Sequence, residues 1–255
     1  MNASIQDRQL EVIELRQYTL RPNKRDALID LFDRELVEPQ EAVGMTVLGQ
    51  FRDLDHPDLF VWLRGFESMQ TRLNGLKAFY GGVTWQAHAE AANATMLDSD
   101  NVLLLRPAWE GAHLPKDATP RASRDATAIP PGLVDITVFY LDAPASAELL
   151  TFCRERMTYV LNVGGACAQG WYITEPRENN FPDCPCGHTS MCWWGLPCFP
   201  TSHGSRHLAV RTCGRVRLLR SWRSGRSGRP RRTGCCQRRA RPSMRRPSAV
   251  GSERP

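Results

Sequence analysis

Five residues with the chemistry of a binding site recur at alternate positions in two short stretches of the chain. Glu14, Arg16 and Tyr18 lie in the first stretch, and Trp62 and Arg64 lie in the second. Alternate side chains of a β-strand lie on one face of the sheet. A guanidinium offers a planar pair of donors that matches a carboxylate, and aromatic rings provide apolar walls. These residues therefore predict a ligand-binding site for a small, flat, anionic or aromatic molecule.

The same residues have a second interpretation, which the sequence leaves open. Glu14 could pair with Arg16 or Arg64 across neighbouring strands, and the rings could anchor an interface with another protein. In that case Arg64→Ala lowers folding stability and leaves ligand affinity unchanged.

Candidates for catalysis are weak. Tyr18 and His88 are the two side chains considered as proton acceptors, and the catalytic residues stay unassigned. Residues 1–182 contain no Gly-rich phosphate loop, no nucleophile elbow and no pair of metal ligands at a familiar spacing. We therefore expect no metal site and no cofactor.

The two stretches fall on the first and third strands of a predicted βαββαβ unit. Alternating or apolar runs predict strands at 11–20, 45–52, 59–66 and 102–105, with helical patterns between them. This is the order of the ferredoxin-like α+β fold, in which the first and third strands are central neighbours. The polar and aromatic side chains are expected on the bare face of the sheet, and the small aliphatic ones under the helices.

The pattern begins again after a shift of 121 positions, without a gap. Ile13 meets Val134, and Gly44 meets Gly165. A register that keeps both the strand pattern and the glycine predicts a duplicated module.

The chain therefore divides into four segments. We expect a complete module at 9–108, a linker at 109–132, a partial second module at 133–182 and a tail at 183–255. Gap-free repetition would place the third strand of the second module near position 180, where prolines exclude a central strand. The second module is thus expected to hold only β-α-β and to leave its sheet open.

The tail differs in composition from the rest of the chain. It carries 16 Arg and no Lys and has a net charge of +14, whereas residues 1–182 carry −8. It also lacks Ile, Asn and Tyr, whose codons are rich in A and T. This composition is typical of GC-rich coding DNA that is translated in the wrong reading frame. We hypothesise a frameshift after about Pro182, or a disordered tail. Its Cys and His spacing fits no familiar zinc finger and its Arg residues lack interleaved rings, so no nucleic-acid partner is expected.

The compartment is predicted from two absences in the sequence. The first residues show no basic region followed by an apolar run, and no apolar stretch reaches the roughly 18–20 residues of a membrane helix. A cytoplasmic protein without a membrane partner is expected.

Three motifs of the first module are Glu14-Leu-Arg-x-Tyr18-Thr-Leu-x-Pro22, Phe60-Val-Trp62-Leu-Arg64 and Tyr80-Gly-Gly-x-x-Trp85. Together they resemble the NIPSNAP family. The resemblance covers 9–108 and, in the second copy, reaches about position 182, with Phe66 standing where Tyr is commoner. It implies a dimeric α/β-barrel whose two sheets pack face to face, so the partner is a second copy or another such module. Relatives of this barrel include cofactor-independent monooxygenases, isomerases, haem enzymes and binding proteins, and no reaction is assigned.

Three functions are compatible with these observations. The first is a barrel protein that binds a small flat anionic or aromatic molecule. The second is a cofactor-independent monooxygenase or isomerase acting on a phenolic or polycyclic acid, with Tyr18 or His88 as proton acceptor and Arg16 and Arg64 holding the anion. The third is a protein–protein interaction module. Whether the protein is an enzyme is left open.

Overall fold

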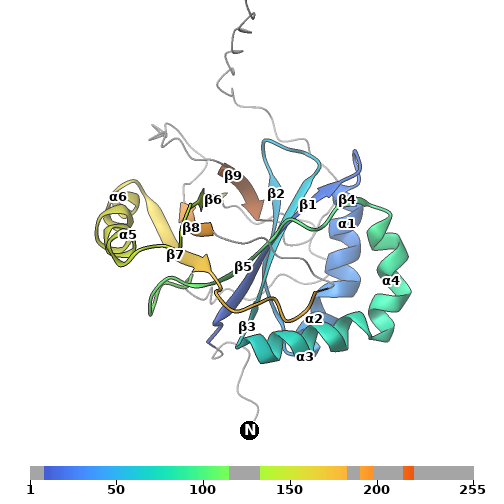
Figure 1. Cartoon of the computed structure of the whole chain (residues 1–255). Coiled ribbons are helices and arrows are strands. Elements are labelled where there is room, and N and C mark those ends of the chain that lie inside the picture. Colours follow the sequence, from blue (N-terminus) through green and yellow to red (C-terminus); the bar gives the residue numbers. More distant parts are fainter. Residues whose placement is uncertain (1–8, 115–132, 183–189, 198–214, 221–255) are drawn as a thin grey trace, which may run out of the picture.

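The first module has the predicted order of strands and helices. The structure is a computed structural model that describes residues 9–114, 133–182, 190–197 and 215–220 (Figure 1). The module contains β1 (Val12–Leu20), α1 (Arg25–Leu31), the π-helical segment η2 (Phe32–Leu36), α2 (Val37–Ala42), β2 (Thr46–Asp53), β3 (Leu59–Phe66), α3 (Met69–Tyr80), α4 (Val83–Asn93), β4 (Met96–Asp98) and β5 (Val102–Pro107).

The junction of α3 and α4 depends on local sequence. Ser68 begins α3 with a capping box, because its side chain accepts from the Thr71 N–H while Thr71 Oγ1 accepts from the Ser68 N–H. Such a cap contributes about 1 kcal/mol. The helix ends at Gly81 and Gly82, where a Cβ would lie 2.9 Å from Lys77 O and 2.8 Å from Ala78 O. These two glycines therefore allow α4 to turn back sharply across the module.

The second module repeats the geometry of the first at the predicted shift. It contains β6 (Leu133–Tyr140), α5 (Ala147–Phe152), the π-helical segment η3 (Cys153–Met157), α6 (Thr158–Val163), β7 (Ala166–Thr174), β8 (Ser190–Pro197) and β9 (Arg215–Arg220). The π-helical segments start 121 residues apart, and so do Gly44 and Gly165, whose φ values are 88° and 93°. Because π-helical segments are rare, their matched positions support duplication.

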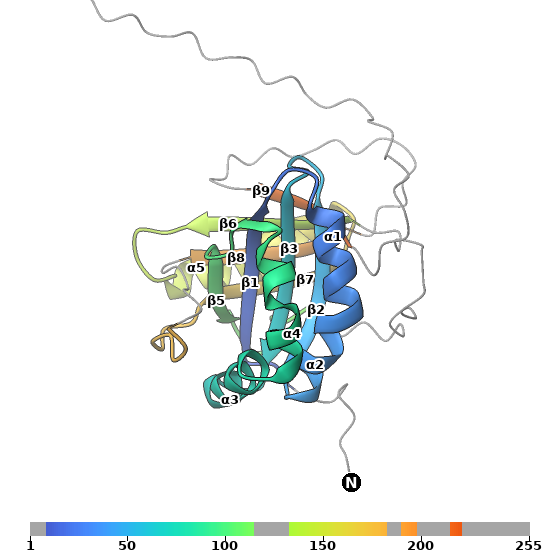
Figure 2. The same ribbon diagram turned by 90° about the vertical axis from the view of Figure 1, so that its right-hand side faces the viewer.

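The eight long strands of the two modules close into one curled antiparallel sheet. Within the first module the order is β5-β1-β3-β2, and within the second it is β9-β6-β8-β7. Pairing of β2 with β9 and of β5 with β7 joins the two at both edges. Figure 2 shows the strands of the two modules crossing, with α1 to α4 on the outer side of the first. The two repeats of one chain thus form the α/β-barrel that was expected of a pair of modules.

The second module contains two strands, β8 and β9, beyond the expected β-α-β. Strand β8 lies between β6 and β7, and β9 lies on the other side of β6. Val134, Ile136 and Val138 of β6 therefore have strand neighbours. Residues 180–182, the described part of that stretch, do not form a strand. However, the chain inserts extra residues and begins β8 at Ser190, in a run of apolar and aromatic residues that favours β-structure.

The predicted linker and tail are only partly covered by the described residues. Residues 109–114 of the predicted linker pack on the second module, since Ala112 is buried and the Trp109 ring lies 5.9 Å from that of Trp171. Most of the linker and most of the tail lie outside the described residues, so the frameshift stays a hypothesis. In the described part of the chain no helix is long and apolar enough to cross a membrane.

The two faces of the first sheet are reversed relative to the prediction. The aliphatic face, with Ile13, Leu15, Val61 and Leu63, packs inside the barrel against Val134, Ile136 and Val138. The aromatic face, with Tyr18, Phe60, Trp62 and Phe66, lies under α1, η2, α2 and α3. Small side chains suit the barrel interior, because the two sheets approach each other closely there. The predicted site therefore lies between sheet and helices, and not on a bare face.

Candidate functional site

The structure brings the five predicted site residues together on adjacent strands. In the β1–β3 register Glu14 lies opposite Arg64, Arg16 lies opposite Trp62, and Tyr18 lies opposite Phe60. Antiparallel neighbours of this kind are within contact distance on one face.

A buried ion cluster occupies one end of this face. The Glu14 carboxylate accepts hydrogen bonds from Arg16 Nη1 at 2.8 Å, from Arg64 Nε at 2.7 Å and from Arg72 Nε at 2.7 Å. The side chains of Glu14, Arg64 and Arg72 are fully buried, and Arg16 is 4% exposed. Among the described residues, three guanidiniums thus surround one carboxylate.

The charge state of Glu14 follows from this arrangement. Burial by itself would raise the pKa of the Glu14 carboxyl, but the charges of Arg64, Arg16 and Arg72 outweigh it and hold the pKa far below its usual value. Glu14 is therefore ionised at neutral pH, and a buried ionised group of this kind depends on its partners.

Two members of the site were missed in the sequence, Arg72 on α3 and Gln40 on α2. Gln40 Oε1 accepts from Arg64 Nη1 at 3.1 Å, and Gln40 Nε2 donates to Leu36 O at 3.0 Å. Arg72 could have been found, because it occupies the buried helical stripe that contains Met69 and Leu76. Gln40 carried no comparable signal.

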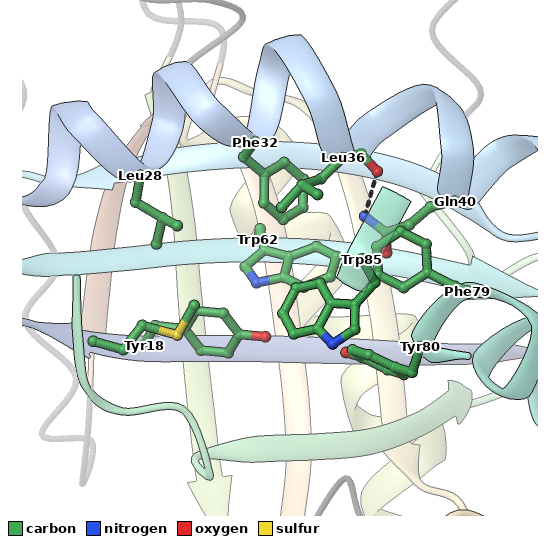
Figure 3. A pocket seen from close by; sticks show the side chains of 10 residues that line it. Tyr18, Leu28, Phe32, Leu36, Gln40, Trp62, Phe79, Tyr80 and Trp85 are labelled. Atoms are coloured by element: carbon green, nitrogen blue, oxygen red, sulfur yellow. Dashed lines mark hydrogen bonds between the residues drawn. The ribbon is translucent and has the colours of Figure 1, made fainter. Parts of the chain in front are cut away.

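Next to the ion cluster lies a small cavity, which we call the aromatic chamber (Figure 3). Its free volume is about 30 Å³, enough for about two water molecules. Trp62 is its floor: the Trp62 ring centroid lies 4.7 Å from that of Phe32 and 5.9 Å from that of Tyr18. The lining residues are Tyr18, Leu28, Phe32, Leu36, Gln40, Trp62, Phe79, Tyr80, Trp85 and Met96.

The chamber contains one buried donor without a hydrogen-bond partner. Trp62 is 2% exposed, and its Nε1–H has no acceptor. Figure 3 shows this nitrogen on the side of the indole turned toward Tyr18. Since buried donors are almost always satisfied in native proteins, the Trp62 Nε1–H indicates a place where an acceptor binds.

Two guanidiniums of the ion cluster, those of Arg16 and Arg64, lie against rings that line the chamber. Arg16 Nε donates to the Tyr18 hydroxyl at 2.8 Å. The Arg64 guanidinium lies over the Trp62 ring at 5.2 Å and over the Tyr80 ring at 5.9 Å. The walls are therefore largely aromatic, and two guanidiniums lie behind them.

Helix α4 forms the outer wall of the chamber. Ala92 is its one buried residue, and the half-buried Trp85 ring contacts Tyr80 at 5.1 Å and Phe79 at 5.7 Å.

His88 does not line the chamber; its Nε2 lies 3.7 Å from Glu35 Oε2 on η2. The structure thus separates the two weak catalytic candidates, Tyr18 and His88. Within the described residues no group of three or more His, Cys, Asp or Glu side chains could hold a metal ion.

Comparison with known proteins gives the family of the first module. Residues 13–109 match the model of the NIPSNAP family. A NIPSNAP family protein from Agrobacterium tumefaciens is 21% identical, and the match covers 38% of this chain and 91% of that protein, with a TM-score of 0.35. No curated protein matches the chain.

Two structures with matches over more of the chain share lower identity. A putative monooxygenase from Fusobacterium nucleatum is 9% identical, over 83% of this chain and 92% of its own, with a TM-score of 0.51. A putative monooxygenase from Lactobacillus acidophilus is 13% identical, over 83% and 94%, with a TM-score of 0.48. At 9% identity the likeness to the Fusobacterium protein shows the fold alone, and its extent covers both modules.

Proposed function

Since residues 13–109 of this chain form a NIPSNAP domain, we propose that the domain binds a small, flat aromatic molecule with an anionic group in the aromatic chamber. The unpartnered Trp62 Nε1–H is the observation that carries the proposal. A carboxylate or phenolate oxygen of the ligand accepts this hydrogen bond, and its ring packs among the aromatic walls.

The charge of the neighbouring cluster favours an anionic ligand over a neutral one. Three guanidiniums contact the single Glu14 carboxylate among the described residues, and two of them lie against rings that line the chamber. At low effective dielectric such charges act over several ångströms. An aromatic carboxylate is therefore expected to bind more tightly than the corresponding alcohol.

The chamber must widen to admit a ring, and α4 is the element that can move. A volume of about 30 Å³ is too small for a benzene ring. Trp85 is half-buried, and α4 buries Ala92 alone. A rotation of α4 about Gly81 and Gly82 would open the outer wall and leave Trp62 in place on the sheet.

Burial of the predicted rings favours an internal site over an interaction surface. Tyr18 is 6% exposed and Trp62 is 2% exposed, so neither ring is available to a protein partner. For a proton-transfer reaction only one of the two candidate acceptors is in place, because Tyr18 lines the chamber and His88 lies outside it.

The proposal is tested by filling the chamber. Leu28 lines it, and Leu28→Phe places a ring in the free volume. Leu149 is the equivalent residue of the second module, so Leu149→Phe is the matched control. Tryptophan fluorescence is titrated with benzoate, salicylate and benzyl alcohol at constant ionic strength.

Saturable quenching by the two carboxylates is expected in the wild type and in Leu149→Phe, and at least tenfold weaker quenching in Leu28→Phe. Benzyl alcohol is expected to bind more weakly than benzoate. No saturable quenching in the wild type, or the same loss in both variants, would overturn the proposal.

A further inference from the structure

Residues 175–182, which follow β7, connect the second module to the site of the first. We call this segment the strap. In Figure 1 it leaves the end of β7 and runs across the picture to the ends of α2 and α3. Its first residue is anchored on β5, because the Glu175 N–H donates to Leu104 O at 2.9 Å and Glu175 is 4% exposed.

Two asparagines of the strap contact the ion cluster. Arg72 Nη1 donates to Asn180 Oδ1 at 2.7 Å and to Asn179 Oδ1 at 3.0 Å. Asn180 Nδ2 donates to Met69 O at 2.7 Å, in the first turn of α3. The Arg72 side chain is thus bound at Nε by Glu14 of the first module and at Nη1 by the second module.

The next residue of the strap contacts the wall of the aromatic chamber. The Phe181 ring stacks on the Tyr80 ring with centroids 5.9 Å apart and an interplanar angle of 17°. Phe181 also packs on the core between sheet and helices. Tyr80 lines the chamber and lies immediately before the Gly81–Gly82 turn into α4.

We propose that the ligand site belongs to both repeats, with Asn180 and Phe181 of the strap as its positioning residues. Asn180 holds Arg72 of the ion cluster, and Phe181 holds the Tyr80 ring from which α4 turns. For its ligand, this inference rests on the proposed function. The control of α4 by the strap does not, because it is a property of the protein without ligand.

This arrangement makes the second repeat a specificity determinant of the first. Asn180 presents a neutral acceptor to Arg72, so the strap binds the guanidinium without neutralising it. An aspartate at this position would add a carboxylate about 2.7 Å from Arg72 Nη1. Such a charge weakens the attraction of the cluster for an anion and has no matching effect on a neutral ring.

Two variants of the full chain separate these roles, and each has a control in the second module. Asn180→Asp tests the charge, with Asn162→Asp on the exposed side of α6 as its control. Phe181→Ala tests the stack, with Phe152→Ala as its control, since Phe152 is 53% exposed. Binding of benzoate and benzyl alcohol is measured by fluorescence, and amide hydrogen exchange across 69–93 is measured without ligand.

For Asn180→Asp we expect benzoate affinity to fall about tenfold and benzyl alcohol affinity to stay within twofold. For Phe181→Ala we expect both affinities to fall about three- to tenfold, the range that one aromatic pair supplies. Exchange across 69–93 is expected to be faster in Phe181→Ala than in the wild type, and unchanged in Phe152→Ala.

The outcomes distinguish this inference from the proposed function. If the wild type binds no probe, the proposed function fails, and unchanged exchange in Phe181→Ala would separately overturn the control of α4 by the strap. If the wild type binds but Asn180→Asp weakens both probes equally, Asn180 has only a structural role and the specificity claim is overturned.

Discussion

Replacement of Glu14 by Gln tests whether the ion cluster stabilises the sheet–helix layer. Glu14→Gln keeps the shape of the side chain and removes the charge that three buried guanidiniums contact at 2.7–2.8 Å. Loss of one partner from a buried ion pair costs about 3–5 kcal/mol. Because three partners are affected here, we expect the free energy of unfolding at pH 7 to fall by about 4–5 kcal/mol.

The same variant predicts a pH dependence with a definite sign. The folded-state pKa of Glu14 is depressed, so its contribution to stability is complete above the unfolded pKa near 4.5 and is lost as the pH falls toward the folded pKa. One proton contributes about 1.4 kcal/mol per pH unit. The difference between wild type and Glu14→Gln should therefore shrink by about 2–3 kcal/mol between pH 6.5 and pH 2.5.

The assay is urea denaturation followed by circular dichroism at both pH values. Glu35→Gln is the control, since Glu35 forms a partly exposed pair with Arg34 and its loss should cost under about 1 kcal/mol. A cost below 1 kcal/mol for Glu14→Gln at pH 7, or an equal cost at both pH values, would refute the reasoning.

Two further predictions concern the repeats. Gly44→Ala and Gly165→Ala should each lower the free energy of unfolding by about 1–2 kcal/mol, because both residues have φ near +90°. Urea denaturation measures this. No loss of stability at either site would contradict the claim that the two modules end their first helix in the same backbone conformation. Burial raises the pKa of the Cys153 thiol to about 11, so iodoacetamide at pH 8 should modify Cys153 in urea and not in the native chain. Peptide mass spectrometry measures this, and equal labelling in both conditions would contradict the burial.

The order of strands and helices could be predicted from period and turn residues, and so could the grouping of site residues on one face. Alternation assigns side chains to a shared face but does not say which face the helices cover. Here Arg72 and Gln40 come from the covering helices and satisfy Glu14 and Arg64, so a polar face can be buried. The partners lie 24 to 58 residues apart in the sequence, so no local pattern indicates their contact.

The strands of the second module show a different limit. The 121-residue shift predicts β6, the helix and β7 correctly, because no residue is inserted among them. It fails for β8, since an insertion moves the strand past the prolines. The contacts of the strap were also missed, although Asn179, Asn180 and Phe181 lie five to seven residues after the end of β7. A polar pair and a ring in a connecting segment have no period that would reveal their partners.

The central claim is that Trp62 Nε1–H donates to an anionic group of a ligand, and nuclear magnetic resonance of the indole N–H groups tests it most directly. The Trp62 signal is assigned by its absence in Trp62→Phe, and Trp171, which is also 2% exposed, is assigned in the same way as the control. On addition of salicylate to the full chain, we predict a downfield shift of the Trp62 signal and an unchanged Trp171 signal. An unchanged Trp62 signal at saturating ligand would contradict the account.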